Sequence, residues 1–294
     1  MRASLPWRHL LLALSVIVVW GTNFVVIKSA LEQFPPLLFA ALRFTFVLLP
    51  AVFLLKRPDV PWRQLAAYGL LIGVGQFGIL YTAMNGQISP GLASVVMQSQ
   101  VLFTILFSVW LEGERLRALQ VTAIALAVGG IGVIAWHTDG DTTALGLGMA
   151  LAAALSWAGG NFVAKRSGKV NMLAYVVWAS MFCLPPLFAL SLLIEGWDAI
   201  DYALRHADTA GWTGVLWQTV GNTLFGYVGW GWLLARHPSA TIAPLALLIP
   251  IVGLASAVWW LDEPMPAWKV AAATLVVGGV ALNMLWPRMK ARMG

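Results

Sequence analysis

The chain has 294 residues, of which 60% are hydrophobic and only 10% are charged. Soluble domains are about 45–50% apolar and about 25% charged, so the composition excludes an ordinary soluble enzyme and indicates a polytopic membrane protein. In such a protein the net charge of +6 reports topology before it reports a nucleic-acid partner. The single cysteine, Cys183, excludes an intrachain disulfide.

Ten segments are apolar and long enough to cross a bilayer as helices, which takes about 20 residues. They cover approximately residues 10–29, 36–55, 66–87, 90–111, 117–136, 145–165, 172–194, 212–234, 239–261 and 267–287. The first follows Arg2 and Arg8 as a secretory signal would, but it lacks a small-x-small cleavage site, so we expect it to be retained. The longest connection, at about 195–211, leaves no room for a soluble domain.

Positive charges are distributed unevenly between the two ends of these segments. Of the 18 Lys and Arg residues, only Lys28, Arg205 and Lys269 fall on the side opposite the N-terminus, and only Arg43 lies well inside a segment. Cytoplasmic connections of membrane proteins are enriched in Lys and Arg. The sequence therefore predicts a multi-pass membrane protein with both termini in the cytoplasm.

The two halves of the chain repeat one pattern. The motif Trp20-Gly-Thr-Asn-Phe-Val-Val-Ile-Lys28 returns as Trp157-Ala-Gly-Gly-Asn-Phe-Val-Ala-Lys165. A run from Trp110 through Glu114 to a Gly pair returns from Trp260 through Glu263 to a second Gly pair. We therefore divide the chain into a first unit, residues 1–138, and a second unit, residues 139–294, with five segments each.

An odd number of segments in each unit inverts the second unit relative to the first. The loop after the fourth segment carries Arg115 and Arg117, whereas the matching loop after the ninth carries Pro264 and Pro266. Inverted repeats are typical of secondary transporters, whose substrate sites lie where the repeats meet. Chance similarity between apolar helices is the alternative, which the ordered match of Trp, Asn, Phe and Lys disfavours. The predicted fold class is an all-α polytopic membrane protein, with ten transmembrane helices in two inverted five-helix repeats around a central cavity.

These motifs resemble those of the EamA family of the drug/metabolite transporter superfamily. The family pattern includes the Trp-Gly-x-Asn-Phe opening, an Arg43-Phe44 pair and the stretch Pro90-Gly-Leu-Ala-Ser94. The resemblance covers nearly the whole chain and implies ten helices around a cavity that moves amino acids or other small metabolites, commonly outward. Within the family, the chain is similar to the bacterial aromatic amino-acid exporters.

The two units differ in their prolines. Pro244 and Pro250 lie in the ninth segment, where the fourth segment has Val95 and Val101. Proline removes a helical hydrogen bond and bends a helix. We therefore expect a bend in the ninth segment rather than in the fourth.

Polar side chains inside apolar segments point at cavities, since their exposure to lipid costs free energy. The amides at such positions are Asn23, Gln76, Asn85, Gln98, Gln100, Asn161, Gln218 and Asn222. They suit a zwitterionic substrate, or alternatively they join helices by hydrogen bonds. The predicted substrate-binding residues are Trp20, Asn23, Tyr81, Gln98, Trp157, Asn161, Asn222 and Tyr227. Because Asn23 and Asn161 occupy equivalent helices, we expect them to meet near the pseudo-twofold axis.

Trp20 and Trp157 lie nearer the centres of their segments than most of the tryptophans do. Their rings either stack on an aromatic or apolar group of the substrate or pack beside Gly21 and Gly159. The residues themselves do not decide between these two roles.

Charged residues are rare at membrane depth. Arg43 either pairs with a substrate carboxylate or, as we prefer, has a structural role and binds helix carbonyls. Glu114 and Glu263 lie at segment ends, where helix-end and loop contacts are expected. No Asp or Glu occurs near the middle of any segment, and all histidines lie at ends or in loops. We therefore predict that no titrating side chain of the central cavity couples transport to protons.

With this resemblance, the predicted function is a secondary transporter of the bacterial inner (plasma) membrane that exports small neutral or zwitterionic metabolites by alternating access. The favoured cargo is amino acids with aromatic or large apolar side chains. Nucleotide sugars, sugar phosphates and drugs are alternative cargoes, although a phosphate would need more cations than Arg43. An intramembrane enzyme is disfavoured, because no cluster of His, Asp and Glu lies at membrane depth. We predict no catalytic residue, metal or cofactor, a small-molecule substrate and the lipid bilayer as partners, no nucleic acid, and a monomer.

Overall fold

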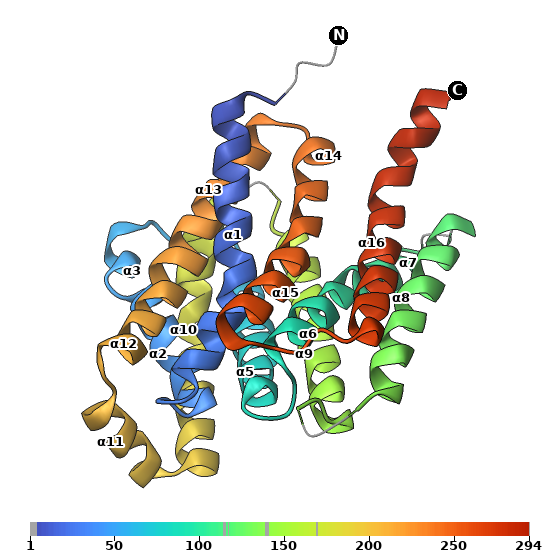
Figure 1. Ribbon diagram of the computed structural model, residues 1–294. Coiled ribbons are helices and arrows are strands. Elements are labelled where there is room, and N and C mark those ends of the chain that lie inside the picture. Colours follow the sequence, from blue (N-terminus) through green and yellow to red (C-terminus); the bar gives the residue numbers. More distant parts are fainter. Residues whose placement is uncertain (1–4, 114–115, 117, 139–140, 169, 294) are drawn as a thin grey trace.

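A computed structural model describes residues 5–113, 116, 118–138, 141–168 and 170–293, with the backbone alone at 239–240 and 285–293. Its regular secondary structure in these residues is all helical (Figure 1). Arg2, Glu114, Arg115 and Arg117, which entered the sequence predictions, lie outside the described residues.

The five predicted segments of the first unit are helical. Segment 1 is α1 (Trp7–Ala30), and segment 2 is α2 (Pro36–Leu48) followed by α3 (Ala51–Leu54). Segment 3 consists of α4 (Trp62–Gly69), the π-helix η1 (Leu70–Gly78) and α5 (Ile79–Met84). Segment 4 consists of α6 (Pro90–Val96), the 3-10 helix η2 (Met97–Ser99) and α7 (Gln100–Glu112), and segment 5 is α8 (Ala118–Trp136).

The second unit follows the same order. Segment 6 is α9 (Ala144–Lys165), and segment 7 is α10 (Met172–Leu190) with the π-helix η3 (Ser191–Glu195). Segment 8 consists of α12 (Thr209–Leu216), the π-helix η4 (Trp217–Phe225) and α13 (Gly226–Arg236). Segment 9 consists of α14 (Ser239–Ile242), the 3-10 helix η5 (Ala243–Leu247) and α15 (Leu248–Leu261), and segment 10 is α16 (Ala267–Met293).

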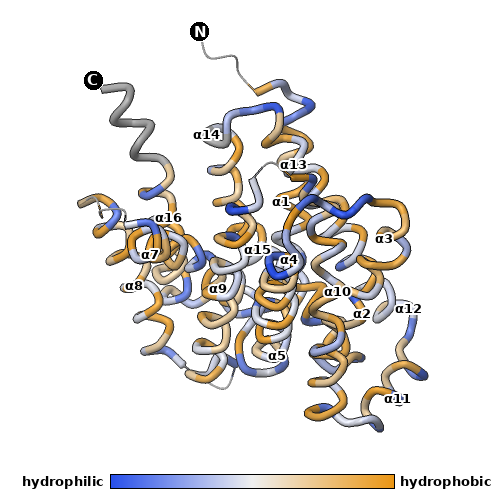
Figure 2. Tube along the Cα trace, turned by 180° about the vertical axis from the view of Figure 1, so that it is seen from behind, coloured by the Kyte–Doolittle hydropathy of each residue, from blue (hydrophilic) through white to orange (hydrophobic). Residues whose placement is uncertain are grey.

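Nine helices in the described part of the chain are apolar and long enough to cross a membrane. They correspond to every predicted segment except the eighth, and Figure 2 shows hydrophobic residues along the long helices and hydrophilic ones at many of their connections. Segment 8 is helical without a break from 209 to 236. Its mean hydropathy is lowered by Gln218, Thr219, Asn222 and Thr223, which share its π-helical middle.

Several helices begin at residues that suit a helix N-terminus. The Ser89 side chain accepts a hydrogen bond from the Leu92 amide, and Pro90 occupies the first turn of α6. Thr143 and Asn171 cap α9 and α10 in the same way. Such caps satisfy backbone N–H groups that have no partner within the helix.

Segments 4 and 9 each contain a 3-10 turn. In segment 9 the turn η5 contains Pro244, which lacks the amide needed for helical bonding. In segment 4 the turn η2 contains no proline, and the Ser99 hydroxyl donates to the Val96 carbonyl. The expectation of a bend in the ninth segment rather than in the fourth stays a prediction.

The connection at 195–211 contains a helix that the sequence analysis missed. Helix α11 (Trp197–His206) buries Ile200 and Ala203, whereas Trp197 and Tyr202 are exposed. A ten-residue amphipathic stretch is too short and too polar to appear as a span.

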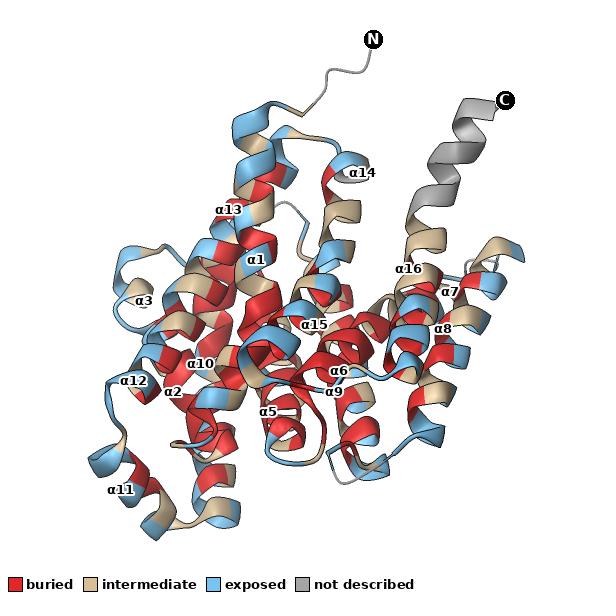
Figure 3. Ribbon diagram, viewed as in Figure 1, coloured by how far each residue is buried: buried red, intermediate tan, exposed pale blue. Residues whose placement is uncertain are grey.

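Helices of the two units pack in a reciprocal pattern. Helix α1 packs against α12, α13 and α15 of the second unit, while α9 packs against η1, α5 and α7 of the first. Helix α2 packs against α10, and α8 packs against α16 at one edge of the bundle (Figure 1). Buried residues gather around α1, α2, α5, α6 and α10 (Figure 3). The core therefore lies between the units, where segments 1, 2, 3 and 8 bring polar side chains together.

Candidate functional site

A buried polar network centres on the Gln218 side chain, which is 0% exposed. Its amide oxygen Oε1 accepts hydrogen bonds from Arg43 Nη1 at 3.1 Å, Tyr81 Oη at 3.0 Å and Asn222 Nδ2 at 3.2 Å. Its Nε2 donates to Asn23 Oδ1 at 2.7 Å. One glutamine therefore connects segments 1, 2, 3 and 8, which include helices of both units.

The π-helix η4 places these side chains on one face of segment 8. The Asn222 amide reaches back four residues to Gln218, and the Thr223 hydroxyl reaches back five residues to the Gln218 carbonyl at 2.8 Å. Single π-helical turns inside α-helices occur frequently at functional sites. The Asn222 carbonyl accepts a hydrogen bond from Trp20 Nε1 at 3.0 Å, so the π-helix also anchors segment 1.

Arg43 is the largest fully buried side chain, at 1% exposure. Its Nη1 donates to the Tyr81 hydroxyl at 2.9 Å, and its Nη2 donates to the Thr223 hydroxyl at 3.0 Å. The guanidinium lies 3.6 Å from the centroid of the Phe77 ring, within the range of cation–π attraction. Arg43 does not bind helix carbonyls through this group, contrary to our preferred sequence interpretation, because its hydrogen bonds go to side-chain oxygens.

Trp20 forms an aromatic wall beside this network. Its ring centroid lies 5.3 Å from that of Trp230 and 6.3 Å from that of Tyr227. The close neighbour that permits this packing is Gly226, where an added Cβ would come within 2.3 Å of Trp20 Nε1. Trp20 therefore packs beside a glycine of segment 8, whereas Gly21 faces Val252.

The predicted substrate-binding residues lie on segments 1, 3, 4, 6 and 8. Trp20, Asn23, Tyr81, Asn222 and Tyr227 belong to the network and its aromatic wall. The remaining predicted residues, Gln98, Trp157 and Asn161, lie on segments 4 and 6.

Asn23 and Asn161 have different hydrogen-bond partners, and the expectation that they meet near the pseudo-twofold axis stays a prediction. Asn161 Nδ2 donates to Gln100 Oε1 at 3.4 Å, while Asn23 binds Gln218. Each asparagine thus pairs with a glutamine of the opposite unit. Asn85, another of the amides counted as membrane-buried, is exposed at the end of α5.

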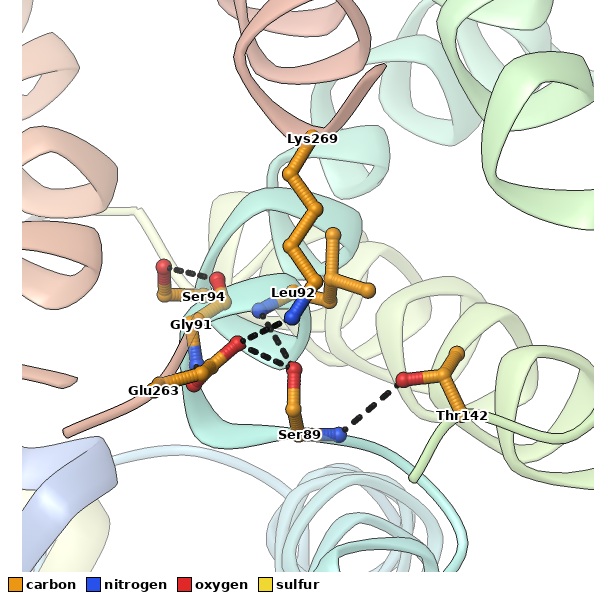
Figure 4. Close-up of polar contacts among 7 residues, drawn as sticks. All are labelled: Ser89, Gly91, Leu92, Ser94, Thr142, Glu263 and Lys269. Atoms are coloured by element: carbon orange, nitrogen blue, oxygen red, sulfur yellow. Dashed lines mark hydrogen bonds and ion pairs between the residues drawn. The ribbon is translucent and has the colours of Figure 1, made fainter. Parts of the chain in front are cut away.

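A second buried cluster joins the loop after segment 9 to the start of segment 4 (Figure 4). Glu263 and Lys269 form an ion pair of 2.9 Å, with side chains only 6% and 5% exposed. The Glu263 carboxylate also accepts from the Ser89 hydroxyl and from the Gly91 amide at 2.9 Å. The expected helix-end and loop contacts of Glu263 are confirmed, but the sequence analysis did not anticipate its burial, for which the Ser-Pro-Gly turn facing it was the available signal.

An open groove borders the network. It has a volume of about 680 Å³ and runs between α1 and α12, with a mostly apolar lining that includes Thr22, Val25, Trp217 and Trp260. Thr22 and Trp217 immediately precede Asn23 and Gln218 of the network. Trp217 Nε1 is buried without a hydrogen-bond partner among the described residues.

Comparison with known proteins finds relatives that match nearly the whole chain. The EamA-like transporter family matches residues 7–136 and, separately, residues 144–285. A protein of Escherichia coli (strain K12) named "Probable amino-acid metabolite efflux pump" is 40% identical over 285 residues, covering 95% of both chains. A protein of the same name from Salmonella typhimurium is 41% identical with the same coverage. A crystal structure that covers 96% of this chain and 98% of its own superposes with a TM-score of 0.62 at 21% identity, which shows the fold alone.

Proposed function

Because the chain belongs to the EamA-like transporter family, we propose that it exports amino-acid metabolites across the bacterial inner membrane by alternating access. The observation that carries this function is the similarity, along nearly the whole chain, to two proteins named as efflux pumps for such metabolites. The apolar spans agree with a carrier of this kind. An amide-rich network buried between the units supplies polar groups at membrane depth, and such groups commonly mark substrate pathways.

The proposed architecture has ten spans in two inverted repeats. It is supported by the separate family matches to the two halves and by the reciprocal packing of α1 and α9 against the opposite units. Equivalent segments also share their irregularities: segments 3 and 8 each contain a nine-residue π-helix, and segments 4 and 9 each contain a 3-10 turn. On this proposal segment 8 is the tenth span, and its polar middle faces the interior of the bundle.

The proposed orientation has both termini in the cytoplasm. Helix α1 begins and α16 ends at the same end of the bundle (Figure 1). The excess of Lys and Arg at that end favours the cytoplasmic side.

The proposed substrate site lies between the network and segments 4 and 6. Amides of Asn23 and Asn222 offer hydrogen bonds to the charged and polar groups of an amino acid, and Trp20 and Tyr227 offer an aromatic surface to its side chain. Trp157, Asn161 and Gln98 line the opposite wall in this proposal. Motion of segments 1 and 8 against segments 3, 4 and 6 would then expose the site to one side at a time.

Counterflow in proteoliposomes tests the function. Purified protein is reconstituted with an unlabelled amino acid inside, and uptake of the labelled amino acid is followed for a panel of amino acids and, in parallel, nucleotide sugars. We expect counterflow for one or more amino acids with equal pH on both sides, because no carboxylate is placed to carry a proton at mid-membrane. Counterflow confined to nucleotide sugars, or a strict need for a pH gradient, would contradict the proposal.

Matched variants test the site. Asn23→Ala and Asn222→Ala are expected to reduce counterflow about 10-fold or more, the scale of one lost hydrogen bond to a charged group. Asn85→Ala is the control, since this amide is exposed at the end of α5. Equal activity in all three variants would reject the proposed location of the site.

A further inference from the structure

Arg43 carries a buried charge that no carboxylate of the described residues neutralises. Its hydrogen bonds go to the neutral oxygens of Tyr81, Gln218 and Thr223, and its nearest ring partner, Phe77, is also uncharged. Transferring an unpaired ion out of water costs several kcal/mol or more. A cation held in this way at membrane depth commonly marks the path of a ligand of opposite charge.

The network around Arg43 also contains more donors than acceptors. Three N–H or O–H groups, from Arg43, Tyr81 and Asn222, converge on the single oxygen Gln218 Oε1. A carbonyl oxygen has two lone pairs, so three donors exceed its capacity. Arg43 Nε is buried with no hydrogen-bond partner among the described residues.

The donors that converge on Gln218 Oε1 suit a carboxylate better than they suit this single amide oxygen. A carboxylate offers two oxygens, about four lone-pair sites and a negative charge. A guanidinium binds the two oxygens side by side through parallel N–H bonds. We infer that Arg43 anchors the carboxylate of the transported amino-acid metabolite, and that Gln218 Oε1 holds the position which one carboxylate oxygen takes in the complex. This inference rests on the proposed function and names the group of the cargo that the network recognises.

The charge balance favours a carboxylate over a phosphate. Arg43 is the one Arg or Lys among the described side chains of the network, and its other members are neutral. One cation balances one carboxylate, whereas a phosphate ester carries up to about two negative charges at neutral pH. The aromatic residues nearby suit an apolar group attached to that carboxylate.

Recognition requires Gln218 to move. Arg43 is 1% exposed, so a substrate reaches it only when segments 2, 3 and 8 separate. Gln218 is the side chain that joins these segments, and it belongs to the π-helix η4 beside the groove residue Trp217. Exchange of the amide oxygen for a carboxylate oxygen would free the Gln218 side chain and thereby link binding to the motion of segment 8.

The first test uses the wild-type protein with two probes of equal shape. Counterflow is measured with an amino acid, starting with phenylalanine and proceeding to the best amino acid of the panel, and with the carboxamide of the same amino acid. We expect the acid to be transported more efficiently than the amide by about 10- to 100-fold, the loss typical of a hydrogen-bonded charge. Equal efficiency for the two probes would overturn the inference without any variant.

The second test asks whether Arg43 causes this preference. Arg43→Gln is expected to bring the acid-to-amide ratio close to one, and Arg43→Lys, which keeps a charge but loses the planar fork, to give an intermediate ratio. Thr45→Val on the same helix is the control, because its hydroxyl bonds only the Ala41 carbonyl. A merely structural role of Arg43 would lower transport of both probes equally and leave the ratio unchanged.

Failure of this inference is distinguishable from failure of the proposed function. Absence of counterflow for every amino acid would reject the function itself. Transport of amino acids with an acid-to-amide ratio that is the same in the wild type and in Arg43→Gln would reject only the role of Arg43.

Discussion

Arg43 and Lys269 are both buried cations, at 1% and 4% exposure, yet their surroundings differ in charge. Lys269 lies 2.9 Å from the Glu263 carboxylate, which also accepts from Ser89 and Gly91. Arg43 has only neutral oxygens and an aromatic ring around it. The first charge is neutralised inside the protein, whereas the second is left for a ligand to neutralise.

The charge of Lys269 is paired within the chain and has a structural role, whereas the unpaired charge of Arg43 is the one that we propose binds the cargo. The Glu263–Lys269 pair joins the loop after segment 9 to the start of segment 4, and all of its partners belong to the chain (Figure 4). A satisfied pair of this kind gives little reason to expect a substrate. Substitution of each charged residue in turn tests whether the two buried cations differ in this way.

The largest loss of stability is expected for Glu263→Gln, because it leaves the Lys269 ammonium buried without a counter-ion. Removing one partner of a buried pair typically costs about 3–5 kcal/mol of the free energy of unfolding. Denaturation of the purified protein in detergent measures it. The double variant Glu263→Gln/Lys269→Met should recover most of the loss, and a double variant as unstable as the single one would refute this account.

Arg43→Met is expected to lower the free energy of unfolding by about 1–3 kcal/mol, the cost of leaving buried acceptors without their donors, because Arg43 donates to Tyr81, Gln218 and Thr223. The loss should be smaller than for Glu263→Gln, because the substitution removes an uncompensated charge rather than half of a pair. Transport of the amino acid should fall as for Arg43→Gln. If Arg43→Met destabilises the protein as strongly as Glu263→Gln, the contrast between the two cations is incorrect.

Ser89→Ala should lower the free energy of unfolding by about 1 kcal/mol, the usual value of a helix N-cap. Its hydroxyl both caps α6 and donates to Glu263. Ser256→Ala serves as the control, because that hydroxyl bonds only the Gly253 carbonyl of its own helix. Equal stability of both variants would show that the contact with Glu263 contributes nothing measurable.

The smallest effect is expected at Asp208, an exposed carboxylate before α12. Its hydrogen bonds from Gln33 and from the backbone amides of Gly211 and Ala210 hold its pKa below the ordinary 3.8. A lowered pKa stabilises the folded state above the ordinary value and ceases to do so as the pH falls through the folded value. Asp208→Asn should therefore melt slightly below the wild type at pH 7, and the difference should shrink as the pH falls below 3.8. A difference that stays unchanged down to the lowest pH at which the protein remains folded would contradict the assignment.

Most of the helical segments could be predicted from the sequence, because long apolar runs between polar connections have one stable form in a bilayer. The segment that departs from this rule is the eighth, whose amides lower its hydropathy below that of the nine recognised spans. The 3-10 turn of segment 4 could not be predicted from prolines, since η2 (Met97–Ser99) contains none.

The site was only partly predictable. Amides and aromatic residues at membrane depth identified Asn23, Tyr81 and Asn222, because their burial needs partners. Gln218, which joins them, was noticed but left out of the predicted site, although its spacing of four residues from Asn222 places both on one helical face. Which glutamine each of Asn23 and Asn161 binds depends on how the two units pack.

Hydropathy and the order of residues are enough to identify a membrane protein with apolar segments, a duplicated motif and a lone basic residue at depth. Which polar side chains meet depends instead on tertiary packing. Glu263 and Lys269 neutralise each other because a turn brings them together, whereas segments 3 and 8 surround Arg43 with neutral groups and no described carboxylate pairs with it. The charge of a residue can be read from its identity, whereas its neutralisation depends on neighbours that are distant in the chain.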